Sequence, residues 1–333
     1  MSYKRKMVAI AAASFVLTLF AGLSAMAADE NHPAIRLGMV GLDTSHVIAF
    51  TNMMNDPNNA DYVPGAKVVA GFRGGSSDIE SSISRVDDYT KQLQEKFGVM
   101  IYDSIAELCR NVDGVLIESV DGRPHLEQAK QVIAAGLPMF IDKPVGGCFE
   151  DALEIARLAK KAGVPWFGGS SLHWVRTWRE AMKPEKIGEI LGCDSYSPCS
   201  YEPHHPDLFW YGVHGVDPLY AAMGRGCQTV ARTHTEDYDY VVGVWKDGRI
   251  GTYRGMRKGA HDYGMTIFGS KDQVEVKGHS YKGLVEEIVK FFQTKKPPIS
   301  AEEIVEMYAF MQAADESKNQ GGKPVPVPQF SLE

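Results

Sequence analysis

The sequence of 333 residues lacks the features that mark several large classes of protein. Its five cysteines are scattered, and no two have the CxxC spacing that is typical of zinc and redox motifs. Lysine and arginine total 35 against 42 acidic residues, and the formal net charge of −7 argues against nucleic acid or an anionic membrane as a partner. No internal repeat or low-complexity tract is present. What remains is a globular composition, long enough for two domains.

A long apolar run occurs only at the N-terminus. Three basic residues at 4–6 precede an apolar stretch over 7–23, and Ala25-Met26-Ala27 has the small-x-small pattern that a signal peptidase recognises. We therefore expect residues 1–27 to be a Sec-type signal peptide and the mature chain to be periplasmic or secreted. No later window reaches about 18 apolar residues, so no membrane-spanning helix is expected.

The predicted export raises the question of disulfides. An odd number of cysteines leaves at least one thiol unpaired in the monomer. Cys193 and Cys199 either pair with each other in an oxidising compartment or are buried as small hydrophobic side chains. The sequence leaves both alternatives open.

The first half of the mature chain alternates strand-like and helix-like segments. Branched apolar residues and turn signals predict strands at 34–40, 66–72, 99–102, 112–120, 138–141 and 164–168. Amphipathic segments between them predict helices at 46–54, 85–97, 105–111, 124–135 and 149–162. This alternation is typical of an α/β fold with a doubly wound parallel sheet. We place this Rossmann domain at residues 33–148.

The second half of the chain has a different pattern. Strand-like segments joined by short turns are predicted at 192–201, 228–235, 238–245, 250–256, 263–268 and 273–276. Amphipathic helices are predicted at 281–292 and 301–317, to cover the sheet or return to the first domain. We expect residues 149–322 to form an α/β domain with a large open, mostly antiparallel sheet, followed by an extended tail at 323–333.

The tetrapeptide Ile141-Asp142-Lys143-Pro144 lies at the end of a predicted buried strand. Ligands of open α/β sheets bind at the carboxyl ends of the parallel strands. An amine held in that place can assist proton transfer. Lys143 is therefore a candidate catalytic residue.

The lysine tetrapeptide belongs to a larger set of motifs. The others are Gly38-x-x-Gly41, the segment 112–117, His125-x-Glu127-x-Ala129 and Ala135-Gly136-x-Pro138. Together they resemble the glucose-fructose oxidoreductase, inositol dehydrogenase and rhizopine oxidoreductase family (Gfo/Idh/MocA) over nearly the whole mature chain; the family usually has glutamate where this chain has Asp142. The resemblance implies a Rossmann domain followed by an open-sheet domain, NAD or NADP as cofactor, a sugar or polyol substrate, and homo-oligomers.

The same resemblance assigns roles to the segment 210–217. Lys143 matches the catalytic lysine of the family, His214 falls on its catalytic histidine, and Trp210 stands where the family commonly has an aspartate. With tryptophan in place of the aspartate, the site has one proton-transfer group fewer, and the indole offers a flat surface on which a sugar can stack. We predict Lys143, His214 and Tyr211 as catalytic residues. The predicted substrate contacts are Lys143, His173, Trp210, Tyr211, His214 and Asp217.

The glycine loop after the first strand departs from the usual Gly-x-Gly-x-x-Gly pattern. The segment 41–46 keeps only Gly41, and Asp43 directs a negative charge at a diphosphate unless the carboxylate turns away to cap the helix. After the second strand, Arg73 replaces the usual acid and suits a 2′-phosphate. The predicted cofactor contacts are Gly41, Leu42, Thr44, Ser45, His46, Arg73, Glu118, His125 and Lys143.

These observations favour an exported NAD(P)-dependent oxidoreductase that acts on a sugar, polyol or glycoside hydroxyl. One alternative is a glycoside-cleaving enzyme that oxidises its substrate transiently and retains NAD. The other is a non-redox sugar- or metal-binding protein, because a Sec substrate crosses the membrane unfolded and the glycine loop is altered. His204, His205, Asp207, His214 and Asp217 lie close in sequence, but their spacing matches no metal motif, so no metal site is predicted.

Overall fold

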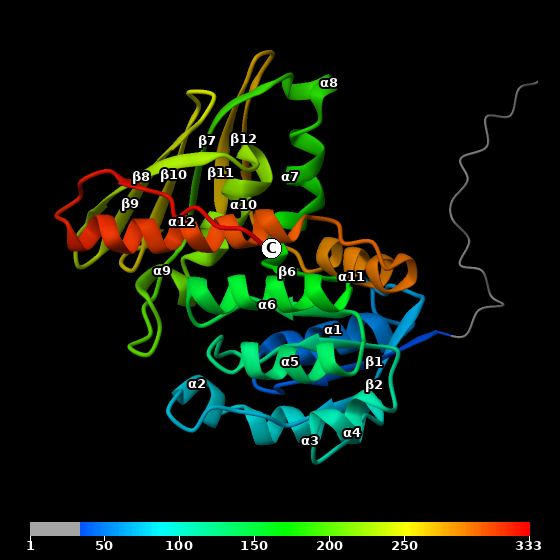
Figure 1. Ribbon diagram of the computed structural model, residues 1–333. Helices are drawn as coiled ribbons and strands as arrows, with labels where there is room; N and C mark the ends of the chain where they lie inside the picture. The colour runs from blue at the N-terminus through cyan, green and yellow to red at the C-terminus, as the bar shows by residue number, and fades with distance from the viewer. Residues whose placement is uncertain (1–33) are drawn as a thin grey trace, which may run out of the picture. The chain divides into compact units, whose positions relative to one another are not determined.

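Two β-sheets organise the part of the chain that the computed structural model describes, residues 34–333 (Figure 1). The predicted signal peptide at 1–27 lies outside the described residues. The α/β class, with a Rossmann domain followed by an open-sheet domain, is confirmed.

The first sheet has six strands in the order β3-β2-β1-β4-β5-β6, and every neighbouring pair is parallel. The strand order reverses between β1 and β4, and this switch point is where open α/β sheets bind their ligands. The strands are β1 (Ile35–Val40), β2 (Ala66–Phe72), β3 (Met100–Ile101), β4 (Gly114–Ile117), β5 (Met139–Asp142) and β6 (Trp166–Gly169).

Helices cover the first sheet because each presents an apolar face to it. In α6 (Phe149–Ala162) acids occupy the first turn, lysines the last, and Gly163 ends the helix with a positive φ of 68°. These charges complement the helix dipole, and glycine adopts a positive φ without steric cost. The other helices of this domain are α1 (Ser45–Asn55), α2 (Glu80–Ile83), α3 (Val86–Phe97), α4 (Ile105–Cys109) and α5 (His125–Ala134).

The end of the first domain differs from the predicted boundary at 148. Strand β6 pairs with β5 through Trp166 to Gly169, and α6 makes the crossover between them. A crossover helix and its strand belong to the sheet that they extend. The first sheet therefore ends at Gly169, and the second domain begins after it.

Short helices connect the two sheets. They are η1 (Ser171–Trp174), α7 (Arg176–Ala181) and α8 (Pro184–Ile187). The short α9 (Asp207–Trp210) and the longer α10 (Val213–Met223) follow β7 (Ile190–Pro198), the first strand of the second sheet. One or two helical turns show too little periodicity to be recognised in a sequence. Helix α10 packs against β7 and η1, which fixes the segment around His214 between the two domains.

The second sheet has seven strands in the order β12-β11-β7-β10-β9-β8-β13. Only the pair β7 and β10 is parallel, so the expectation of a mostly antiparallel sheet is confirmed. The strands are β7 (Ile190–Pro198), β8 (Cys227–His234), β9 (Tyr238–Trp245), β10 (Ile250–Met256), β11 (Gly264–Gly269), β12 (Gln273–Lys277) and β13 (Val325–Pro326).

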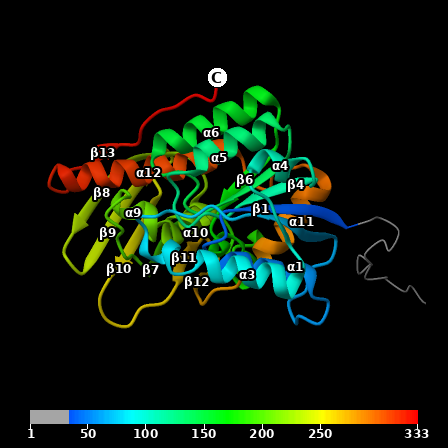
Figure 2. The ribbon, with the colours of Figure 1, turned by 90° about the horizontal axis from the view of Figure 1, so that it is seen from below.

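The C-terminal segments tie the two domains together. Helix α12 (Ala301–Asn319) lies between α6 and the second sheet, and α11 (Lys282–Thr294) packs against α1 and η1 (Figures 1 and 2). The tail predicted as merely extended is part of the fold, because β13 pairs with β8 and Phe330 contacts Phe149. The buried apolar side chains form one continuous cluster that includes residues of both domains.

All five cysteines lie in the described part of the chain, and all five are free. Cys193 and Cys199 do not pair with each other; both are buried, which is the second of the two alternatives above. Among residues 34–333, no helix is both long enough and apolar enough to cross a bilayer.

Candidate functional site

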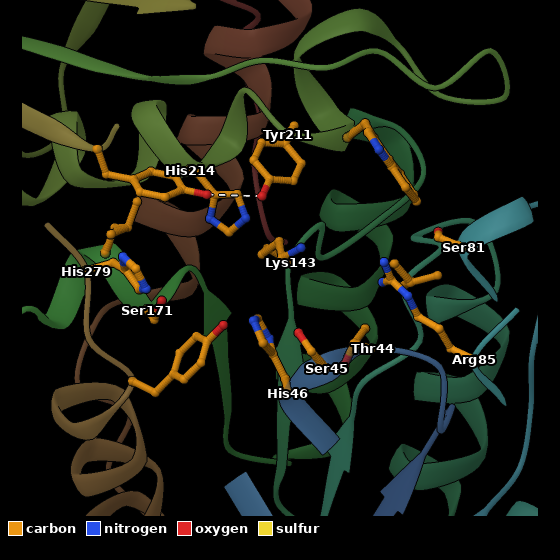
Figure 3. Close-up of a pocket in the computed structure, with 15 residues that line it drawn as sticks. Thr44, Ser45, His46, Ser81, Arg85, Lys143, Ser171, Tyr211, His214 and His279 are labelled. Carbon is orange, nitrogen blue, oxygen red and sulfur yellow. Dashed lines mark hydrogen bonds between the residues drawn. The ribbon is translucent and has the colours of Figure 1, made fainter. Parts of the chain in front are cut away.

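A cavity of about 390 Å³ lies at the carboxyl ends of the Rossmann strands and is lined by residues from both domains. Figure 3 shows Lys143 near its centre, with His214 and Tyr211 on one side and Ser45 and His46 on the other. The lining residues are Thr44, Ser45, His46, Ser81, Arg85, Val120, Lys143, Ser171, Leu172, Trp210, Tyr211, His214, Tyr263, His279 and Tyr281. We call this cavity the central pocket.

Lys143 and His214 face the central pocket from different domains. Lys143 follows the last residue of β5 and is 9% exposed; its amine lies 5.9 Å from the centroid of the Tyr211 ring. His214 lies in the first turn of α10. The end of β5 and the start of α10 thus bring Lys143 and His214 into one pocket, although they are 71 positions apart in the sequence.

A buried hydrogen-bond chain holds His214 in place. Its Nδ1 lies 2.8 Å from Ser170 Oγ, and the Ser170 backbone N–H donates to Asp217 Oδ2. The other oxygen of Asp217 lies 2.6 Å from His173 Nδ1. Asp217 and His173 therefore lie behind the pocket wall and support it, and neither lines the pocket.

Burial lowers the pKa of His214 well below its ordinary value of 6.5, and the positive charge of Lys143 acts in the same direction. His214 is therefore a neutral imidazole near pH 7. A neutral imidazole in contact with a ligand can accept a proton.

The low pKa of His214 makes a pH effect on stability predictable. Below pH 6.5, His214 binds a proton in the unfolded chain but stays neutral in the folded protein. The free energy of unfolding should therefore fall as the pH decreases from 6.5 towards the folded-state pKa. In His214→Asn this contribution, up to about 1.4 kcal/mol per pH unit, should disappear. Urea unfolding of both proteins between pH 5 and 7 measures the two slopes. Equal slopes would show that His214 titrates normally.

Tyrosine and histidine side chains complete the wall beside His214. The Tyr211 and Tyr263 hydroxyls are 3.0 Å apart, and the Tyr263 ring packs edge-on against both His214 and His279. Burial and the hydrogen bond to Tyr211 raise the pKa of Tyr263, so its hydroxyl stays protonated. Neutral hydroxyls and imidazoles are both donors and acceptors, which suits a polyhydroxylated ligand.

At the opposite side of the pocket lies the N-terminus of α1. The first-turn residues Ser45 and His46 line the pocket, as does Thr44, whose buried hydroxyl has no hydrogen-bond partner among the described residues. Asp43 is turned away from the pocket: its carboxylate accepts hydrogen bonds from Val120 N–H at 2.8 Å and from Ser82 Oγ at 2.6 Å. The expected repulsion of a phosphate is thus relieved, although by hydrogen bonds from α2 and from the loop after β4 and not by a cap of α1.

Two further groups at this end suit an anion. Arg85 lines the pocket, and its guanidinium has no hydrogen-bond or ion-pair partner among residues 34–333. Ser81 Oγ is buried, and no residue of the described segment 34–333 forms a hydrogen bond with it. The diphosphate of a dinucleotide would be bound well by this set of groups: the N-terminus of α1, the hydroxyls of Thr44 and Ser81, and the guanidinium of Arg85. The residues present therefore fit a nicotinamide cofactor. The N-terminus of α1 would bind the diphosphate, a task in which a glycine-rich loop usually takes part.

Two buried acids lie next to the pocket residue His46, at the carboxyl ends of β4 and β5. Glu118 follows β4 and Asp142 ends β5; both are 0% exposed. Asp142 Oδ2 lies 2.6 Å from His46 Nδ1, whereas neither Glu118 oxygen has a hydrogen-bond partner in the part of the chain that the structure describes. Burial and the negative charge of Asp142 raise the pKa of Glu118.

The structure leaves several predicted contact residues outside the pocket lining. Leu42 is in the core, His125 is buried with Nε2 3.0 Å from Ser119 O, and Arg73 pairs with Asp87 on the surface. Gly41 has a φ of 84°, and a Cβ there would lie 2.0 Å from Ser119 Oγ, so this glycine permits close packing of two loops. The predicted residues that line the pocket are Thr44, Ser45, His46, Lys143, Trp210, Tyr211 and His214.

Sequence reasoning missed six polar lining residues, Ser81, Arg85, Ser171, Tyr263, His279 and Tyr281. Four of them lie in loops or short turns, and no local spacing relates them to Lys143. Two of the histidines and acids that lie close in sequence at 204–217 have other partners in the fold. His205 lies between Glu202 and Asp121, and Asp207 pairs with Arg232.

Comparison with known proteins agrees with this architecture. Residues 35–169 match the model of the oxidoreductase family with an NAD-binding Rossmann fold. No curated protein sequence matches the chain.

Solved structures of dehydrogenases share its fold. The scyllo-inositol dehydrogenase of Lactobacillus casei with bound NAD(H) and scyllo-inositol superposes with a TM-score of 0.72 at 16% identity, covering 89% of this chain and 99% of that one. The myo-inositol 2-dehydrogenase of Lactobacillus plantarum has a TM-score of 0.72 at 17% identity, covering 89% and 100%. A probable dehydrogenase of Thermotoga maritima has a TM-score of 0.69 at 20% identity, covering 88% and 99%. Over residues 35–169, its N-terminal domain, the chain is thus similar to the Gfo/Idh/MocA family of NAD-binding oxidoreductases.

Proposed function

We propose that the protein is an exported NAD-dependent oxidoreductase that acts on a hydroxyl carbon of a cyclic polyol or sugar. The observation that carries this proposal is the shared pocket of Lys143 and His214, which also contains the α1 N-terminus. The similarity to inositol dehydrogenases makes inositols the first substrates to test.

The side chains of the pocket divide the chemistry between them. The Lys143 amine hydrogen-bonds the reacting hydroxyl, and the neutral imidazole of His214 accepts its proton. Tyr211 and Tyr263 orient the neighbouring hydroxyls, and Trp210 offers a stacking surface. Bound NAD⁺ supplies the hydride acceptor.

The diphosphate would be held by Thr44 and Ser45 at the start of α1 together with Ser81 and Arg85. We favour NAD over NADP because Arg73, the residue expected to meet a 2′-phosphate, lies outside the pocket and pairs with Asp87. Export rests on the leader at residues 1–27, as argued from sequence above.

Substitution of Arg85 tests the proposed cofactor site. Because a charge-assisted hydrogen bond contributes about 1.5–3 kcal/mol, Arg85→Ala should weaken NADH binding by roughly 10–100-fold. Fluorescence titration of NADH with the mature protein measures the change. Arg73→Ala is the matched control and should leave NADH affinity unchanged. A selective loss of NADPH binding in the control would restore Arg73 as a 2′-phosphate contact.

The reaction itself is tested with the mature chain, NAD⁺ and a panel of inositols, aldoses and aryl glycosides. Formation of NADH together with a keto product is the expected result. Release of an aglycone with no net change in NADH absorbance would indicate the glycoside-cleaving alternative. Neither product, in protein that binds NADH, would count against a catalytic role for Lys143 and His214.

A further inference from the structure

We propose that His46, Glu118 and Asp142 form a binding site for one divalent transition-metal cation at the wall of the central pocket, where His46 lines it. This inference goes beyond the proposed function and does not depend on NAD binding. It rests on the mutual geometry of three side chains and on carboxylate oxygens that have no hydrogen-bond partner.

The three side chains come from adjacent strand ends. His46 lies in the first turn of α1, directly after β1, while Glu118 follows β4 and Asp142 ends β5. One potential ligand atom from each lies within 4.8 Å of the other two. Ligands about 2.0–2.2 Å from a common metal are at most about 4.4 Å apart, so small side-chain shifts would bring all three into coordination.

Three of the four carboxylate oxygens are unsatisfied. Within residues 34–333, Glu118 Oε1 and Oε2 and Asp142 Oδ1 are buried without hydrogen-bond partners, whereas Asp142 Oδ2 lies 2.6 Å from His46 Nδ1. Buried polar atoms without a partner are rare and costly in folded proteins. We infer that a bound cation is the partner of these three carboxylate oxygens.

The neighbouring amine does not supply that group. Lys143 follows Asp142 in the sequence, yet within residues 34–333 it makes no ion pair with Glu118 or Asp142 within 4.0 Å. A single cation between the two carboxylates would satisfy both and also engage the imidazole. The His46 ring is held by stacking on Phe50 at 5.0 Å and by an edge contact with Tyr281 at 4.9 Å.

The donor set indicates the class of ion. One imidazole nitrogen with two carboxylates suits Zn²⁺ or Mn²⁺ better than Ca²⁺, which prefers six to eight oxygens. His46 also lines the central pocket, so the ion has a path from solvent.

The test uses the full mature chain without a histidine tag. After EDTA treatment and dialysis, ZnCl₂ or MnCl₂ is titrated in a calorimeter, and the metal content is determined by mass spectrometry. We expect about one ion per chain and a rise in Tm on metal addition. Glu118→Gln keeps the shape of the side chain and should weaken binding by more than about tenfold. Glu127→Gln, an exposed acid paired with Lys130, is the control and should bind as the wild type does.

The outcomes that overturn the proposal are distinct. Wild-type protein that takes up no stoichiometric metal, with a Tm insensitive to EDTA, would show that Glu118 is buried as a neutral acid. An NADH-induced rise in Tm that is lost in Glu118→Gln, without any metal uptake, would assign the oxygens to a cofactor hydroxyl. If Glu118→Gln does not fold, Asp142→Asn and the wild-type stoichiometry decide the question. Failure of NADH binding alone would leave the metal result intact.

Discussion

Lys143→Met is expected to lower kcat by about 10²–10⁴-fold, the range by which a positioned proton-handling group contributes to a rate. Methionine keeps most of the length and apolar character of the lysine stem, and so the packing beside Tyr211 should survive. NADH affinity should change far less than kcat, because other residues, Thr44, Ser45, Ser81 and Arg85, are those proposed to hold the diphosphate.

Initial rates with NAD⁺ and the best inositol, measured beside NADH titrations, separate the two effects. Lys130→Met is the matched control, since Lys130 lies on the surface of α5 and pairs with Glu127 at 2.6 Å. It should retain full activity. Lys143→Met protein with a kcat within a few-fold of wild type would remove the amine from the reaction.

Arg232→Met is expected to destabilise the protein by about 3–5 kcal/mol. The guanidinium on β8 is completely buried and donates to Asp239 at 2.9 Å, to Asp207 at 2.8 Å and to the Tyr201 hydroxyl at 2.7 Å; it also pairs with Asp315. Its removal leaves the Asp239 carboxylate, itself 0% exposed on its side chain, with less compensation for its burial. The loss should appear in stability and not in NADH affinity, because none of these residues lines the central pocket.

Urea unfolding midpoints of wild type and variant measure this loss. Arg36→Met provides the control: Arg36 forms an exposed pair with Asp113 at 2.8 Å, and such pairs contribute at most about 1 kcal/mol. Similar midpoints for the Arg232 and Arg36 variants would mean that the acids around Arg232 are neutral when buried.

Much of the fold was accessible from sequence. Strand β2 and helix α6 have the predicted bounds, since apolar periodicity is strong there and Gly163 marks the helix end. The predictions were weakest for segments of one or two turns, such as α2 and α8, whose formation depends on tertiary contacts. The tail was recognised as extended, but its pairing with β8 connects positions about a hundred residues apart and leaves no local signal.

The candidate site was accessible only in part. Lys143 and His214 were singled out by motif and position, and both line the central pocket. Arg85 and Tyr263 had no motif to mark them. His173 and Asp217 were predicted as substrate contacts, but they form the buried pair that supports Ser170 and His214. Sequence spacing predicts that residues are near one another; it does not say which one faces the cavity.

By itself, the sequence determined the order of strands and helices and placed Lys143 at a strand end, because periodicity and turn residues act over a few positions. The tertiary structure decided the rest. It turned the Asp43 carboxylate away from the α1 start, freed Arg85 to face the pocket, and left Glu118 and Asp142 with unsatisfied oxygens beside His46. Such arrangements depend on which loops meet after the sheets have packed, and that is set by contacts between residues far apart in the chain.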